Sequence, residues 1–126
     1  MHPRERPATM FDPTLGTIEY ALDGLQLRTE TIANNIANVN TPLYRSQRVA
    51  FEDTLAAAVR SGQPMPRGAA GAPRVVGGMS IPDSQGNSVH LETEMADISK
   101  TALSRQTLVS GFNYRVGLYK IATGNK

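Results

Sequence analysis

Two stretches of this sequence carry apolar residues at alternating steps of three and four, and this spacing constrains the fold more than any other feature. Such a heptad pattern places the apolar side chains on one stripe of a helix, which a second helix has to cover. Thr29 and Arg105 interrupt the two series, one in each stretch. The predicted seam residues are Leu15, Ile18, Leu22, Leu25, Ile32, Ile36 and Val39 in the first stretch, and Leu91, Met95, Ile98, Ala102, Val109, Phe112, Val116 and Tyr119 in the second.

Start and stop signals bound both predicted helices. Asp12-Pro13 suits a helix start, because the carboxylate can accept hydrogen bonds from free N–H groups and proline is tolerated at the first helical position. Pro42 ends the first helix near residue 40, since it disfavours helical geometry at the residue before it. The second helix is expected to run from Leu91 to about Ala122, with Gly124 as its stop signal.

The middle of the chain predicts little regular structure. Phe51, Leu55 and Val59 follow one another at steps of four and indicate a short amphipathic helix, and residues 45–50 read as a loop or short extended piece. Residues 61–88 are rich in Gly and Pro, so they form either a disordered insert or a segment that a partner orders. Within them, Val75-Val76 and Met79-Ser80-Ile81 could form at most a short strand pair.

The predicted fold class is therefore mainly α. Its long N- and C-terminal helices pair as an antiparallel coiled-coil hairpin, accompanied by a short central helix and the Gly/Pro-rich insert. We divide the chain into a mobile leader (1–11), an N-terminal helix (12–40), a loop with a short helix (41–60), a flexible insert (61–88) and a C-terminal helix (89–126).

A second apolar stripe lies beside each predicted seam. One partner helix covers one stripe, so a second stripe needs another neighbour. The short helix at Phe51 could cover one of them, but it is not long enough for both, and we expect neighbouring copies of the chain to cover the remainder. The predicted intersubunit residues are Tyr20, Leu27, Tyr114, Leu118 and Ile121.

The residue types present argue against catalysis. The chain has no Cys, and its two histidines, His2 and His90, lie far apart in the sequence, so we expect no catalytic residues, metal site or cofactor. We assign Glu92, Glu94 and Asp97 to helix-dipole and solvent-face roles, because no apolar pocket is evident that would perturb them. The net charge of +2 is too weak to indicate nucleic acid, and no small-molecule substrate is expected.

An Asn-rich run marks the end of the first predicted helix. A hydrated, frayed helix end would account for it, since Asn is common near helix C-termini. However, the run Ala-Asn-Asn-Ile-Ala-Asn-Val-Asn-Thr-Pro, followed by Tyr-Arg, resembles the N-terminal signature of the bacterial flagellar axial proteins, which build the rod, hook and hook–filament junction. The flanking residues 21–28, 47–52, 89–95 and 106–109, and the short chain, resemble the proximal rod members. The signature residues are Asn34, Asn35, Ile36, Asn38, Asn40, Thr41, Pro42 and Tyr44.

This resemblance implies a structural subunit of the proximal rod of the flagellar basal body. Such subunits assemble helically through their terminal helices, join the export apparatus to the rest of the rod and transmit torque. The implied partners are copies of the same chain, other rod proteins, the adaptor FliE and the flagellar export gate. The implied location is the rod where it crosses the periplasm, reached by type III export without a cleaved signal peptide. The alternative is a soluble helical-hairpin adaptor or secretion chaperone.

Two positions depart from the pattern of the resembled family. Its members usually have Gly where this chain has Leu43, and because Leu disfavours a positive φ, we expect a different type of turn here. Arg105 stands where an aromatic residue is usual. It would put a charge on the seam unless an acidic neighbour pairs with it, and that neighbour could belong to another subunit.

Overall fold

The computed structural model describes residues 13–65, 71–78, 81–82, 86 and 88–124. Its elements in chain order are α1 (Pro13–Ala37), β1 (Gln47–Ala50), α2 (Glu52–Ser61), β2 (Arg74–Gly77) and α3 (Leu91–Ala122). The described part is mainly helical, as predicted, and within it no helix has the length and apolar character needed to span a bilayer. The predicted leader, the Asp12 cap and the Met79-Ser80 part of the predicted strand lie outside the described residues.

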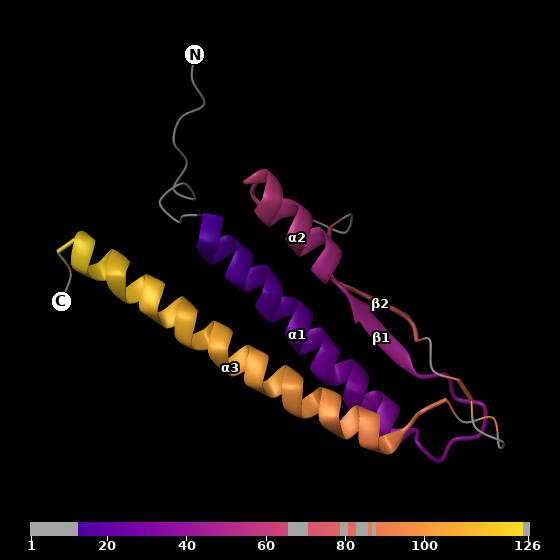
Figure 1. Ribbon diagram of the computed structural model, residues 1–126. Helices are drawn as coiled ribbons and strands as arrows, with labels where there is room; N and C mark the ends of the chain where they lie inside the picture. The colour runs from indigo at the N-terminus through magenta and orange to yellow at the C-terminus, as the bar shows by residue number, and fades with distance from the viewer. Residues whose placement is uncertain (1–12, 66–70, 79–80, 83–85, 87, 125–126) are drawn as a thin grey trace.

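The two long helices pack against each other, which confirms the expected pairing of the chain's two ends. They run in opposite directions, and α1 lies between α3 on one side and α2, β1 and β2 on the other (Figure 1). Their 25 and 32 residues correspond to about 38 Å and 48 Å of helix. The C-terminal turns of α3 therefore project past the start of α1 (Figure 1).

The end of α3 agrees with the sequence signals, whereas α1 ends earlier than they predict. α3 covers the residues predicted for it, and Gly124 beyond its end adopts the left-handed φ of +81°. α1 ends at Ala37, a few residues before the predicted end. The Asn38 N–H still reaches the carbonyl oxygens of Asn34 and Asn35 at 3.1 Å, but residues 38–40 form turns, where Asn is more favourable than inside a helix.

A two-stranded sheet ties the chain after α1 to the Gly/Pro-rich segment. β1 pairs antiparallel with β2, with Val49 opposite Val75, and the Gly78 N–H extends the ladder to the carbonyl oxygen of Ser46 at 3.1 Å. The sequence suggested a strand pair within residues 61–88, so the partner of β2 was not anticipated. The pairing is set by the tertiary structure, because β1 lies on α1 through the buried Val49 and offers its edge to β2.

The apolar core lies between α1 and the β1–α2 segment. Phe51 is 5% exposed, and its ring occupies the space beside Gly24, where a Cβ atom would lie 2.6 Å from the ring. Tyr20 packs edge-on against Phe51 and donates a hydrogen bond from its hydroxyl to the Gly71 carbonyl oxygen at 2.6 Å. The buried core comprises Tyr20, Ala21, Leu25, Val49 and Phe51, with Leu27, Leu55, Met65 and Leu108 packed against it.

This core corrects the prediction that Tyr20 and Leu27 contact other subunits. Tyr20 is buried within its own chain, and Leu27 is partly buried against the same core. The segment around Phe51 thus covers the second stripe of α1, which was the alternative left open by the sequence. No such cover exists for the second stripe of α3 within the described residues, where Tyr114, Leu118 and Ile121 are 68%, 44% and 74% exposed.

The seam predicted for α3 also needs correction. Leu91, Met95, Ala102 and Val109 are exposed, whereas Glu94 and Thr101 are buried. Helical periodicity gives the spacing of an apolar stripe but not the neighbour that it faces. Here α3 is rotated about its axis so that the polar residues Glu94 and Thr101 are buried instead of these apolar ones. The other predicted seam residues of both helices are buried or half-buried: Leu15, Ile18, Leu22, Leu25, Ile32, Ile36, Val39, Ile98, Phe112, Val116 and Tyr119.

Leu43 adopts a conformation that its side chain disfavours. Its φ is +65°, in the left-handed region that glycine occupies without cost. The expectation of a different turn type is therefore wrong. The surrounding structure imposes this backbone geometry on Leu43, even though its side chain is 76% exposed and adds little packing in return.

Candidate functional site

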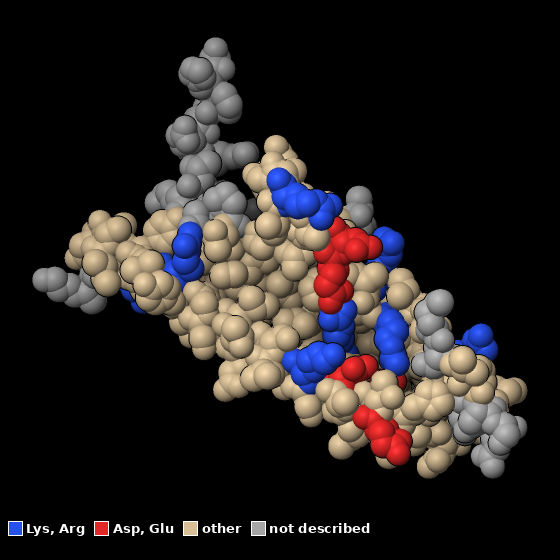
Figure 2. Space-filling view, viewed as in Figure 1, with Lys and Arg blue, Asp and Glu red and all other residues tan. Residues whose placement is uncertain are grey.

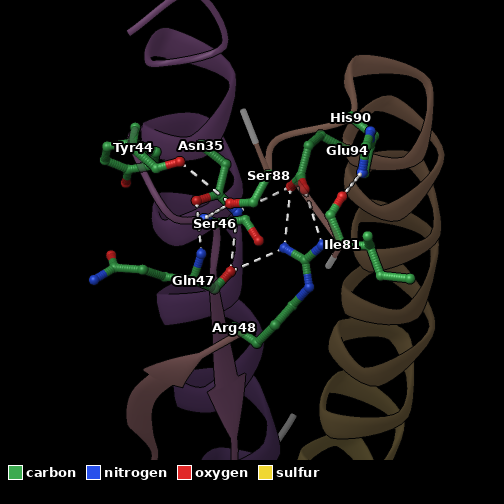
Figure 3. Close-up of polar contacts among 9 residues, drawn as sticks. All are labelled: Asn35, Tyr44, Ser46, Gln47, Arg48, Ile81, Ser88, His90 and Glu94. Carbon is green, nitrogen blue, oxygen red and sulfur yellow. Dashed lines mark hydrogen bonds and ion pairs between the residues drawn. The ribbon is translucent and has the colours of Figure 1, made fainter. Parts of the chain in front are cut away.

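Four side chains or backbone groups from three elements meet at one end of the α1–α3 pair, and we call them the polar cluster: Asn35, Gln47, Arg48 and Glu94. Figure 3 shows Asn35 on α1, Arg48 on β1 and Glu94 on α3 pointing toward one another. Asn35 and Glu94 are both 0% exposed. Polar groups buried this deeply require partners, because an unsatisfied one costs about 1–3 kcal/mol.

Asn35 joins α1 to both neighbours. Its side-chain oxygen accepts from the Gln47 N–H at 3.0 Å, and its Nδ2 donates to the Gln47 carbonyl oxygen at 2.9 Å. The amide thereby pairs with β1 as a neighbouring strand would. The same Nδ2 donates to Oε1 of Glu94 at 3.0 Å, which uses both of its hydrogens. The amide is therefore the group that links the signature run to both β1 and α3.

Arg48 balances the buried charge of Glu94. Its Nη2 lies 2.9 Å from Glu94 Oε2, and its Nη1 donates to Glu94 Oε1 at 3.3 Å and to the Gln47 carbonyl oxygen at 2.9 Å. The two ends of this ion pair differ in exposure, with the Arg48 side chain 31% exposed and that of Glu94 fully buried. The ion pair therefore gives the buried carboxylate of Glu94 a charged partner, without which its burial would be costly.

Glu94 and Arg48 were missed as cluster members by the sequence analysis. Glu94 was assigned to helix-dipole and solvent-face roles near the start of α3, and Arg48 was not singled out. The compensating groups lie 46 and 59 residues away from Glu94 along the chain. No local pattern signals such a pairing. Asn35 itself was identified only through the density of Asn around the end of α1.

A second set of hydrogen bonds closes the same end of the molecule. The Ser46 N–H donates to Ser88 Oγ at 2.7 Å, and the Ser88 hydroxyl donates to the Tyr44 carbonyl oxygen at 3.2 Å. His90 Nε2 lies 3.1 Å from the Ile81 carbonyl oxygen. These contacts attach the segment preceding α3 to the segment following α1, on the same side as the polar cluster (Figure 3).

The rest of the signature shapes the turn rather than the cluster. Asn38 Nδ2 donates to the Asn34 carbonyl oxygen at 2.9 Å, and Thr41 Oγ1 donates to Asn38 Oδ1 at 3.0 Å. Asn34 and Asn40 are exposed. Ile36 and Tyr44 are half-buried, while Thr41 and Pro42 are exposed. Among the signature residues, only Asn35 is fully buried.

A separate contact fixes α2 to α1. Arg28 donates from Nη1 and Nη2 to the two carboxylate oxygens of Glu52, at 2.7 Å and 2.8 Å. Its Nη2 also donates to the Val49 carbonyl oxygen at 2.9 Å. The Arg28 Cζ lies 4.7 Å from the centre of the Phe51 ring. The hydrogen bond from Arg28 holds the pKa of Glu52 below its ordinary value of 4.5, against the opposing effect of partial burial.

The polar cluster has the character of a positioning device. Its buried polar atoms are bonded to one another, and the described residues contain no group of three or more His, Asp or Glu side chains placed to hold a metal ion. A slip of one helical turn between α1 and α3 would leave Glu94 buried without Arg48 and Asn35. The cluster therefore selects one axial register for the two long helices.

Charge is unevenly distributed over the visible face of the molecule. In Figure 2, acidic and basic side chains gather over the strands, the start of α2 and the first turns of α3. The part formed by the N-terminal half of α1 and the C-terminal half of α3 shows a few basic side chains and no acidic one (Figure 2). The exposed apolar side chains Leu103, Tyr114, Leu118 and Ile121 belong to α3. A weakly charged surface with exposed apolar residues suits contact with another protein.

Comparison with known proteins bears on the role of this arrangement. The family model described as "Flagella basal body rod protein" matches residues 17–45, which include most of α1 and the turn after it. The chain is 26% identical to the flagellar basal body rod protein FlgB of Bacillus subtilis (strain 168) over 128 residues, covering 94% of this chain and 99% of that protein. It is 24% identical to FlgB of Aeromonas hydrophila over 131 residues, with the same coverage. In its helical pairing, its signature run and this similarity along nearly its whole length, the chain resembles the flagellar basal body rod proteins, which are structural proteins of the bacterial flagellum and not enzymes.

Proposed function

We propose that this chain is a subunit of the proximal rod, which assembles helically through α1 and α3 and joins the export apparatus to the remainder of the rod. Its similarity to two FlgB proteins over nearly their full length supports this role. In this proposal its partners are further copies, other rod proteins, the adaptor FliE and the export gate. It crosses the periplasm within the rod, arrives by type III export without a cleaved signal and transmits torque.

The observation that carries the proposal is the exposed apolar surface of α3. Leu103, Tyr114 and Ile121 are 65%, 68% and 74% exposed, although α1 is covered on both sides. Burying a side chain of this size contributes about 1.5–3 kcal/mol, so several of them together would drive assembly. A helix that is apolar on several sides is typical of a position surrounded by other helices.

Within the assembled rod, we infer that α1 and α3 form an antiparallel coiled-coil layer. Their opposite directions and the packing of α1 against α3 support that arrangement. Tyr114, Leu118 and Ile121 are the intersubunit residues that we retain. We further propose that residues 61–88 act as a flexible insert that is anchored to the helices through β2.

Complementation of a strain that lacks the gene tests this function. Ile121→Asp and Tyr114→Asp should leave the helix content of the purified chain unchanged, because both side chains are exposed, yet they should prevent incorporation into basal bodies and abolish motility. Val59→Asp is the matched control, since Val59 is 61% exposed but lies on α2. Normal motility of both α3 variants, or a wild-type chain that stays in the soluble fraction, would contradict the proposal.

A further inference from the structure

Arg105 is a charge without an explanation in the isolated chain. It is exposed on α3, between Ala102 and Val109 of the stripe that does not face α1. Among the described residues it makes no hydrogen bond or ion pair within its own chain. From Ile98 to the end of α3 there is no acidic residue, while Lys100, Arg105, Arg115 and Lys120 are basic. This helix half therefore presents a positive charge on an apolar surface.

α1 carries the opposite charge on its outer side. Glu19, Asp23 and Glu30 are exposed and separated by steps of four and seven, so they lie along one stripe of the helix. The basic residue of α1, Arg28, is occupied by Glu52. Glu19 and Asp23 form no hydrogen bond or ion pair with the described residues of their own chain. The stripe is therefore a row of exposed carboxylates along one side of α1.

A shallow hollow lies in the groove between the two long helices. Glu19, Leu22 and Asp23 of α1 and Phe112 of α3 line it. Two carboxylates beside two apolar side chains suit an arginine or lysine, whose aliphatic stem packs on apolar surface while its charged head binds the carboxylates. The hollow itself holds no cationic side chain in its lining.

The chain's own Arg105 is displaced from this hollow along the helix axis. It precedes Phe112 by seven residues, which corresponds to about 10 Å along α3. A neighbouring copy shifted along the axis by a similar length would bring its Arg105 level with Glu19 and Asp23. Because donor and acceptor surfaces are different patches of one chain, this contact repeats without closing, as a filament requires.

We propose that the hollow lined by Glu19, Leu22, Asp23 and Phe112 receives Arg105 of a second copy of this chain, with the exposed Ala102–Val109 stripe of that copy packed on the outer face of α1. The occupant is argued from charge complementarity between the acidic stripe of α1 and the acid-free half of α3. The inference rests on the proposed rod function, for which it specifies one subunit–subunit contact.

Charge reversal tests this contact in the purified full-length chain. At low salt, sedimentation of the wild type over a concentration series should show open-ended growth beyond a dimer. The double variant Glu19→Lys/Asp23→Lys and the single variant Arg105→Glu should each weaken self-association roughly tenfold, and salt should weaken the wild type similarly. Combining all three substitutions should restore association. Arg60→Glu on α2 is the matched control, because Arg60 is also exposed and basic.

A cross-link gives a second, independent measurement. Because the chain has no Cys, the double variant Asp23→Cys/Arg105→Cys contains only the two introduced thiols. Oxidation of this variant should produce a ladder of disulfide-linked chains. A wild type that stays monomeric or stops at a dimer, reversals that do not weaken association, or a failure of the triple variant to recover would each overturn the inference. If the wild type enters basal bodies and the reversed variants enter equally well, this contact is wrong while the rod function stands. Absence of the wild type from basal bodies would instead refute the rod function.

Discussion

Replacing Asn35 with alanine should destabilise the isolated chain more than any other single change in the Asn-rich run. The substitution removes three hydrogen bonds, two to the Gln47 backbone and one to Glu94. At a net contribution of about 1 kcal/mol for each bond, the loss is about 3 kcal/mol. Part of this loss is offset, because water can reach the exposed Gln47 and Glu94 keeps its ion pair with Arg48. The expected decrease in the free energy of unfolding is therefore about 2–3 kcal/mol.

Asn35→Asp provides a sharper version of the same test. The new carboxylate keeps the acceptor for the Gln47 N–H, but it replaces the Nδ2 donor with an oxygen that faces Glu94 and the Gln47 carbonyl oxygen. Two buried carboxylates about 3 Å apart cannot both remain ionised without a large cost. At neutral pH this variant should therefore lose more stability than Asn35→Ala. The deficit should shrink as pH falls, because protonation restores a donor between the two groups.

Urea unfolding followed by circular dichroism at 222 nm measures these differences. Asn34→Ala is the matched control, since Asn34 is the adjacent residue of the same type but is exposed, and its side chain forms no hydrogen bond with the described residues. We expect it to change the free energy of unfolding by less than about 0.5 kcal/mol. Equal effects of the alanine substitutions at the two positions would refute the reasoning that burial and bonding distinguish them.

Further substitutions test other parts of the structure. Gly24→Ala should cost about 1–3 kcal/mol, because its Cβ would lie 2.6 Å from an aromatic ring, whereas Gly16→Ala, with nothing within 4 Å, should stabilise the isolated chain by about 0.5–1 kcal/mol in the same urea assay. Leu43→Gly should raise the melting temperature in a thermal scan, since relief of the positive φ, about 1–2 kcal/mol, exceeds the entropy cost of glycine, about 0.5–1 kcal/mol. Because Arg28 lowers the pKa of Glu52, their contact stabilises the fold above pH 4.5, and this stabilisation is lost as the pH falls below that value. Glu52→Gln should therefore be less stable than the wild type at pH 7, and unfolding measured over a pH series should show the difference vanishing in acid.

Periodicity and turn chemistry predicted the long helices well. The pattern from Leu91 to Ala122 required no tertiary information, because a helix of this length with a glycine beyond its end is locally consistent. The pairing of the two chain ends followed from their matching apolar series. The pairing of β1 with β2 did not, since four-residue strands are decided by the surface on which they lie rather than by their own sequences.

The candidate site shows the same division. Asn35 stood out in the sequence because the Asn residues crowd one helix end, but Asn34, Asn35 and Asn38 are chemically identical there. Only the direction of each side chain distinguishes them, and that direction places Asn35 against Gln47 and Glu94 while leaving Asn34 in solvent. A one-residue difference on a helix is a rotation of about 100°, which composition cannot reveal.

By itself, the amino-acid sequence determined that this protein forms two long amphipathic helices joined by a loosely structured middle. The tertiary structure decided which side of α3 meets α1, because burial of Glu94 is possible only where Asn35 and Arg48 supply its partners. An apolar stripe can turn toward any neighbour that covers it, whereas a buried carboxylate is stable only opposite its own donors. The rotation of α3 was therefore settled by groups distant in the chain, and Leu91, Met95 and Val109 of its predicted seam were left exposed.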